Sequence, residues 1–133
     1  MAPRADRPVA VVAVRLHGDP GRQPGDHRVL VDRLWPRGVR RAALDLDEWA
    51  KDLAPSTELR RWYGHEPERF AAFADRYRAE LAAPEQVARC GALLARAAGR
   101  RLVLLTATRD LERSAAWVLR EVLEAWPPEG PPP

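Results

Sequence analysis

Residues able to hold an anion or to move a proton are concentrated in one stretch, residues 28–41, which reads RVLVDRLWPRGVRR. Asp32 and Arg33 stand where an apolar run gives way to a loop that contains Pro and Gly. A carboxylate there can accept a proton or pair with a cation, and an arginine offers a planar fork of donors to a phosphate or a carboxylate. Trp35 and Arg37 follow, and an indole beside a guanidinium can stack on a planar ligand. The stretch therefore predicts an anion site with Trp35 as one wall.

The positive charge of the chain is local. The 133 residues carry 22 Lys and Arg against 19 Asp and Glu, a formal net charge of +3. Residues 28–41 alone hold five Arg against one Asp, a net charge of +4, so the rest of the chain is close to neutral. Such a local excess indicates an anionic partner better than the overall pI does. A purely structural alternative remains, in which Asp32 forms an ion pair with an Arg and Trp35 fills a core position.

A second group of candidates lies between residues 49 and 65. Lys51 is the single Lys among the 22 basic residues, and either chance or a need for an ammonium group explains it. Ser56 is expected to cap a helix, and the backbone N–H groups that follow it could also hold an anion. His65 lies at a turn between two predicted helices and is either a surface or capping residue or a general acid–base.

A further arginine, Arg109, follows the apolar run 102–105, where a strand is expected to lead into a helix. Ligands of open α/β sheets bind outside the carboxyl ends of strands, so Arg109 is another candidate contact for an anion. Asp32 and His65 are the candidate acid–base pair. The candidate ligand-binding residues are Arg33, Trp35, Arg37, Lys51, Ser56, Arg60 and Arg109.

Other residue types indicate neither a metal site nor a cofactor site. Cys90 is the single Cys, which excludes a disulfide framework within the chain, and its place on an apolar helix stripe predicts a buried thiol. The glycine-rich patterns GxGxxG and P-loop are absent, so no cofactor is predicted. Four residues of the first loop could bracket a metal, but their spacing matches no established site and a solvated turn is favoured: His17, Asp19, Asp26 and His27.

Periodicity indicates which elements position these residues. Alternating Val residues predict a first strand over about 8–16, followed by an exposed loop over 17–27. A second strand, about 28–35, is apolar on both faces up to Asp32, which indicates cover on both sides. A third strand is expected over 102–105. Helices are expected from an Asp45 cap to Pro55, over 57–63, from Pro67 to Leu81, from Pro84 to a stop at Gly99, and from a Thr108 cap to Trp126.

This order predicts one small α/β domain, residues 8–126, with helices packed on a short sheet. Residues 1–7 are expected to form a flexible tail and residues 127–133 a Pro-rich disordered tail. The apolar run after Arg7 lacks a cleavage site, which favours a strand over a signal peptide. No apolar run is long enough to cross a membrane, and the single free Cys favours the cytoplasm.

Six blocks of the sequence carry a family resemblance: VDRLWPRG (31–38), W-x-K (49–51), APS (54–56), ELRRWYGH (58–65), F-x-x-x-Y-x-x-EL (73–81) and LLTATRD (104–110). Together they resemble the YeaO-like branch of the bacterial domain of unknown function 488 family, over about residues 8–126. The resemblance implies a compact, Rossmann-like α/β domain in the bacterial or archaeal cytoplasm, and it brings no biochemical activity with it.

One departure from that family lies in the last helix. Members similar to this chain usually carry an Asn-His-Ala step, whereas this sequence reads Ser114-Ala115-Ala116. A histidine used for chemistry in relatives would therefore be missing here.

Three functions follow as expectations. The first is a small enzyme or sensor that binds a phosphate- or carboxylate-bearing ligand at the strand ends. The second is a nucleic-acid-binding accessory protein that uses the arginines together with Trp35 and Trp62 as stacking surfaces. The third is a module that binds a protein partner without catalysis. The oligomeric state is left open.

Overall fold

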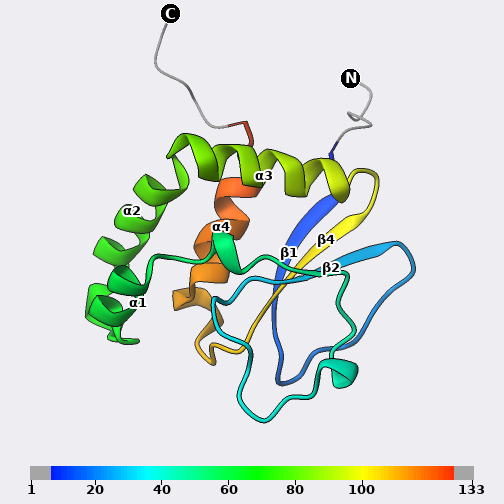
Figure 1. Cartoon of the computed structure of the whole chain (residues 1–133), viewed down its shortest axis with the longest axis horizontal. Helices are drawn as coiled ribbons and strands as arrows, with labels where there is room; N and C mark the ends of the chain where they lie inside the picture. Colours follow the sequence, from blue (N-terminus) through cyan, green and yellow to red (C-terminus); the bar gives the residue numbers. More distant parts are fainter. Residues whose placement is uncertain (1–6, 128–133) are drawn as a thin grey trace, which may run out of the picture.

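A four-stranded, all-parallel sheet lies at the centre of the computed structural model, which describes residues 7–127 (Figure 1). The strands follow the order β1-β4-β2-β3. Their bounds are Ala10–Arg15 for β1, Asp26–Leu30 for β2, Glu48–Trp49 for β3 and Arg101–Thr106 for β4. The predicted α/β domain with helices on a short sheet is confirmed. The predicted tails lie outside the described residues, apart from Arg7 and Pro127 at their inner ends.

Helices join and cover this sheet, and Figure 1 shows α1 and α2 at the left of the view and α3 along its top. Ser56 caps α1, and Pro84 is the first residue of α3, as the sequence predicts. The helices are α1 Thr57–Tyr63, α2 Phe70–Leu81, α3 Pro84–Arg96 and α4 Ala115–Glu124, with 3₁₀ turns η1 Arg41–Ala43, η2 Lys51–Leu53, η3 Pro67–Arg69 and η4 Leu111–Arg113. Between residues 7 and 127, none of these helices has the length and apolar character needed to cross a bilayer.

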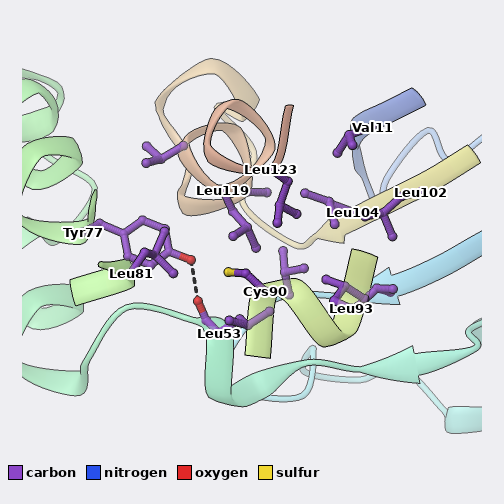
Figure 2. Close-up of a cluster of buried hydrophobic side chains, with 14 of the residues drawn as sticks. Val11, Leu53, Tyr77, Leu81, Cys90, Leu93, Leu102, Leu104, Leu119 and Leu123 are labelled. Carbon is purple, nitrogen blue, oxygen red and sulfur yellow. Dashed lines mark hydrogen bonds between the residues drawn. The ribbon is translucent and has the colours of Figure 1, made fainter. Parts of the chain in front are cut away.

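The main core lies between the helices and one face of the sheet. Figure 2 shows Leu102 and Leu104 of β4 meeting side chains from α3 and α4. Cys90 of α3 is fully buried there, as predicted, and burial raises the pKa of its thiol to about 11. The Tyr77 hydroxyl donates a hydrogen bond to the Leu53 carbonyl oxygen across 2.5 Å, which satisfies the one polar group that α2 brings into this core.

Loops contact the opposite face of the sheet. Arg28 of β2 points to that face and is 1% exposed. Its guanidinium pairs with Asp19 in the β1–β2 loop and donates to the Asp45 carbonyl oxygen in the β2–β3 loop. Arg22 connects the same two loops, because it bonds the carboxylates of Asp45 and Asp47. β2 is thus covered on both sides, as expected, although the second cover is made of loops.

The predicted second strand, 28–35, is wrong at both ends, because β2 spans Asp26–Leu30. The strand begins earlier because its first side chains are buried against polar partners: the Asp26 carboxylate pairs with Arg101, and Nε2 of His27 lies 2.6 Å from the Glu48 carboxylate. After Leu30 the chain leaves the sheet and Asp32 turns toward the end of β4. The solvated turn expected for Asp26 and His27 is therefore wrong, because both side chains are buried in β2.

The predicted helix from Asp45 to Pro55 is also wrong. Residues Glu48–Trp49 form β3 beside β2, and only a single 3₁₀ turn follows. Tertiary contacts override the helical pattern here, since the Glu48 carboxylate accepts hydrogen bonds from Arg96 and lies 2.6 Å from Nε2 of His27.

The start of the last helix needs a third correction. Thr108 was expected as its cap, but α4 begins at Ala115 and Ser114 is the N-cap. The Ser114 hydroxyl oxygen accepts a hydrogen bond from the Trp117 N–H across 3.2 Å. Residues 107–113 form a turn and η4 instead, so the loop after β4 is longer than predicted.

Candidate functional site

A pocket of about 600 Å³ opens at the carboxyl ends of β2 and β4. Open α/β sheets bind ligands at this edge. Its walls are largely apolar, with a few polar groups between them, which is the usual composition of a small-molecule site. The sequence-predicted site residues that line it are Asp32, Arg33, Trp35, Arg37, Arg60 and His65.

Asp32 connects the ends of two neighbouring strands. Its Oδ1 accepts a hydrogen bond from the Thr106 hydroxyl across 2.6 Å, and its Oδ2 accepts one from the Ala107 N–H across 2.8 Å. Burial raises the pKa of the Asp32 carboxyl, although both hydrogen bonds act in the opposite direction. Within residues 7–127 no ion pair involves Asp32, so the expected alternative of an Asp32–Arg pair that closes the loop is not formed.

Arg33 lines the pocket. Its guanidinium donates to the carbonyl oxygens of Pro55 and Ala54 across 3.2 and 3.3 Å. These bonds fasten the loop after β2 to the segment that precedes α1. Arg33 also borders a second, more open hollow of about 650 Å³, together with Asp52 and Arg89. Part of its hydrogen-bonding capacity is therefore used by the fold.

Arg37 and Arg60 differ from Arg33. Both are exposed and both line the pocket, one from the loop after β2 and the other from α1. Within the described residues, neither guanidinium has a hydrogen-bond or ion-pair partner. Leu34, which is 61% exposed, lies beside them in the same pocket lining. The rim thus combines two unpaired cations with an exposed apolar side chain.

Trp35 forms part of the wall, as predicted, and it is fixed by its neighbours. Its indole N–H donates to the Val39 carbonyl oxygen across 2.6 Å. Trp49 of β3 packs against it edge-on, with 5.4 Å between ring centroids, and the Arg41 guanidinium lies 4.9 Å from its ring. Trp49 in turn donates to the Asp32 carbonyl oxygen across 2.7 Å. The two indoles therefore hold the loop that carries Asp32.

His65 lies at the pocket edge, immediately after α1. Gly64 and His65 both have left-handed backbone conformations, with φ of 53° and 58°. The His65 side chain is exposed, and when charged it favours the ionised form of Asp32. Beside it, the Tyr63 hydroxyl donates to the Arg113 carbonyl oxygen across 2.6 Å. The structure thus brings the predicted acid–base pair to one pocket.

The remaining candidates do not line this pocket. The Lys51 ammonium lies 5.2 Å from the Trp49 ring centroid, in a cation–π contact. The Ser56 hydroxyl donates to the Glu80 carboxylate across 2.6 Å and caps α1. Arg109 is exposed, and its carbonyl oxygen accepts a hydrogen bond from Arg15. The side chains of Lys51 and Ser56 thus have contacts within the fold, whereas Arg109 contributes only its carbonyl oxygen.

Sequence reasoning missed several residues of the pocket. Thr106 does not line the pocket, but its hydroxyl holds Asp32, and its place directly after the apolar run 102–105 was the available signal. The apolar wall residues could not be recognised as site residues from the sequence, because their side chains carry no reactive or charged group. The missed lining residues include Pro55, Tyr63, Phe73, Thr108, Ser114 and Ala115. Arg28 was counted in the basic stretch, but it is buried on the far face of the sheet and adds no charge to the pocket.

Comparison with known families decides where the chain belongs. A family model described as "Inactive DUF488-N3 subclade" matches residues 11–127. The chain is a member of the DUF488 family. Among DUF488-like relatives, an uncharacterised protein of Mycobacterium tuberculosis (strain H37Rv) is 44% identical over 118 residues, which cover 88% of this chain and 96% of that protein. The uncharacterised protein YeaO of Escherichia coli (strain K12) is 43% identical over 108 residues, covering 80% and 91%. No solved structure matches significantly.

DUF488 membership confirms the resemblance inferred from the signature blocks. The structure also places the step for which the resemblance implied Asn-His-Ala. Ser114 caps α4, and both Ser114 and Ala115 line the pocket. This part of the last helix therefore lies at the pocket.

Proposed function

We propose that the pocket at the carboxyl edge of the sheet binds a small anionic ligand, bearing a phosphate or a carboxylate, without converting it. The observation that carries this proposal is the pair of unpartnered guanidiniums, Arg37 and Arg60, in a pocket whose walls are mostly apolar. A guanidinium binds a phosphate or a carboxylate through a planar fork of N–H donors, and within the described residues neither of these two forks has a partner.

The start of α4 adds to the positive potential of the pocket. Ser114 and Ala115 line the pocket where the ten-residue helix α4 begins. A helix N-terminus carries a partial positive charge that favours anions. With three arginines against the single carboxylate of Asp32, the charge of the lining favours a negatively charged ligand.

Binding without turnover is favoured for two reasons. The matching family model is described as inactive. Both oxygens of Asp32 also accept hydrogen bonds from the end of β4, which gives this carboxylate a structural task. Cys90, the single thiol of the chain, lies in the core rather than in the pocket. We place the protein in the cytoplasm, because a single Cys allows no disulfide within the chain.

The two alternative functions have less support. The rings of Trp35 and Trp62 already have guanidinium groups over them, Arg41 at 4.9 Å and Arg76 at 4.2 Å, which reduces the aromatic surface open to nucleic-acid bases. A protein-binding surface usually needs a contiguous apolar patch. In residues 7–127 the exposed large hydrophobic side chains are Val9 and Leu34.

A ligand panel on matched variants tests the proposal. Thermal shift and calorimetry are measured with orthophosphate, mononucleotides, dicarboxylates and a short single-stranded oligonucleotide. The variant Arg37→Ala/Arg60→Ala removes the unpaired cations of the pocket. Its control, Arg40→Ala/Arg61→Ala, removes the same charge from adjacent exposed positions that do not line the pocket.

We expect a saturable shift with at least one small anion. A ligand at 100 times its dissociation constant stabilises the folded state by about 2.7 kcal/mol. The affinity should fall at least about tenfold in Arg37→Ala/Arg60→Ala and stay unchanged in the control. Equal losses in both variants, or no shift with any small anion, would overturn the proposal. A shift with the oligonucleotide alone would favour nucleic-acid binding instead.

A further inference from the structure

The pocket contains charges of both signs that do not pair with one another. Asp32 forms no ion pair within the described residues, and neither does Arg37 or Arg60, although all three line the same pocket. The remaining arginine of the lining, Arg33, donates to main-chain carbonyl oxygens rather than to Asp32. A purely anionic ligand would satisfy the arginines and leave the carboxylate without a cation.

Asp32 has capacity for a further donor. A carboxylate offers about four lone-pair sites, and Thr106 and Ala107 each use one. A largely buried carboxylate that lacks a cationic partner is costly, and a donor brought by a ligand would offset that cost. Within the described residues no Lys or Arg side chain pairs with Asp32, and the His65 side chain at the pocket edge is exposed.

Apolar side chains line the same pocket as these charges. Apolar residues of the pocket lining include Val31, Leu34, Pro36, Pro55 and Phe73. An apolar or aromatic body fits such walls, whereas a compact ion such as orthophosphate would leave them in contact with water.

We therefore infer that the natural ligand is bipolar, with an amine or other N–H donor group that contacts Asp32, an anionic group that contacts Arg37 and Arg60, and an apolar body between them. This inference rests on the proposed binding role and adds the chemical class of the ligand. Asp32 is thus a specificity-determining residue, which selects ligands that carry a donor opposite the anionic end.

Three small-molecule probes distinguish what the donor group and the anionic group of such a ligand each contribute to the affinity. Tyramine phosphate carries an ammonium and a phosphate on one aromatic ring, 4-ethylphenyl phosphate lacks only the ammonium, and tyramine lacks only the phosphate. Their affinities are measured by calorimetry on the wild type and on Asp32→Asn. The control Asp75→Asn removes an exposed carboxylate on α2 that does not line the pocket.

On the wild type and on Asp75→Asn, tyramine phosphate should bind about tenfold more tightly than 4-ethylphenyl phosphate, because it adds a charge-assisted hydrogen bond. On Asp32→Asn the two phosphates should bind equally. If the wild type binds tyramine phosphate and 4-ethylphenyl phosphate with equal affinity, the inference of a bipolar ligand is wrong, while the proposed anion site is not affected. This comparison uses the wild-type protein alone, so it does not depend on whether a variant folds.

Other outcomes are equally decisive. If Asp32→Asn folds and keeps the tenfold preference, Asp32 does not contact the donor and the inference is wrong. If tyramine binds and neither phosphate does, the proposed anion site itself is wrong. If none of the three binds at millimolar concentration, the bipolar class is overturned, while the panel with inorganic and organic anions decides the proposed function separately.

Discussion

Thr106, the last residue of β4, donates its hydroxyl to Oδ1 of Asp32 across 2.6 Å, and so joins the ends of two adjacent strands at the mouth of the pocket. Thr106 is 1% exposed, so no water replaces this bond easily. The position of Asp32 in the pocket therefore depends on a residue that itself does not line it.

Replacing that hydroxyl should destabilise the fold. Thr106→Val keeps the shape of the side chain and leaves one oxygen of Asp32 without its donor, at a cost of about 1–2 kcal/mol in the free energy of unfolding. Thr106→Ser retains a hydroxyl and should recover most of that loss. Urea unfolding of both variants measures the difference, and equal stabilities would show that the bond contributes nothing.

Asp32→Asn should change how stability depends on pH. Burial raises the pKa of Asp32 above its unfolded value, so the ionised form destabilises the native state. In the wild type this contribution is fully favourable below the unfolded pKa and is lost as pH rises through the folded pKa. The stability of Asp32→Asn relative to the wild type should therefore rise as pH increases from about 3 toward neutrality. A difference that is flat across this range would contradict the assignment.

Asp26 should behave in the opposite way. Its buried carboxylate is held by two hydrogen bonds from Arg101, each 2.9 Å long, and these lower its pKa. The stability that it contributes is present above the unfolded pKa and is lost as pH falls through the folded pKa. Arg101→Met leaves the charge of Asp26 buried and unpaired, and should cost about 3 kcal/mol at pH 7. The double variant Asp26→Asn/Arg101→Met should be more stable than Arg101→Met alone, and chemical denaturation tests that order.

Ser56→Ala should lower stability without changing ligand affinity. The Ser56 hydroxyl caps α1 through the Leu59 N–H and also bonds Glu80, so its loss should cost about 1–2 kcal/mol. Because Ser56 does not line the pocket, the affinity for whichever small anion the panel identifies should remain within about twofold. A large loss of affinity in a folded Ser56→Ala protein would show that Ser56 belongs to the binding site, and would contradict this prediction.

His65→Gly should be more stable than His65→Ala. His65 has φ of 58°, a conformation that glycine adopts freely and that other residues adopt at a cost of about 1 kcal/mol. Thermal melts of the two variants should therefore differ by a few degrees in favour of glycine. If alanine is equally stable, the left-handed conformation at this position is not a source of strain.

Much of the scaffold could be predicted from the sequence because its signals are local. The bounds of α1 followed from Ser56 and from the proline before it, and the buried thiol of Cys90 followed from an apolar stripe. The part of the pocket lining from Asp32 to Arg37 could be predicted because residues that directly follow a buried strand have a known place in parallel sheets. In each case, neighbouring residues in the chain contain the information.

What could not be predicted depends on contacts between distant residues. The two-residue strand β3 has no periodic pattern of its own, and it exists because Glu48 meets His27 and Arg96. The sequence predicted that Arg28 contributes to the positive charge of the site. Its burial could not be predicted, because its partners, Asp19 and the Asp45 carbonyl oxygen, belong to two different loops. Pairing across such distances leaves no trace in spacing or composition.

The ion pairs that Arg22 forms between two loops have a further consequence for how these loops move. Arg22 belongs to the β1–β2 loop and bonds Asp45 and Asp47 of the β2–β3 loop, which also carries the pocket wall from Leu34 to Arg37. Two loops joined in this way open as one cooperative unit, so their amide hydrogens should exchange with solvent deuterium at a common rate. Access to the pocket would then be governed by a segment of the chain that never touches the ligand.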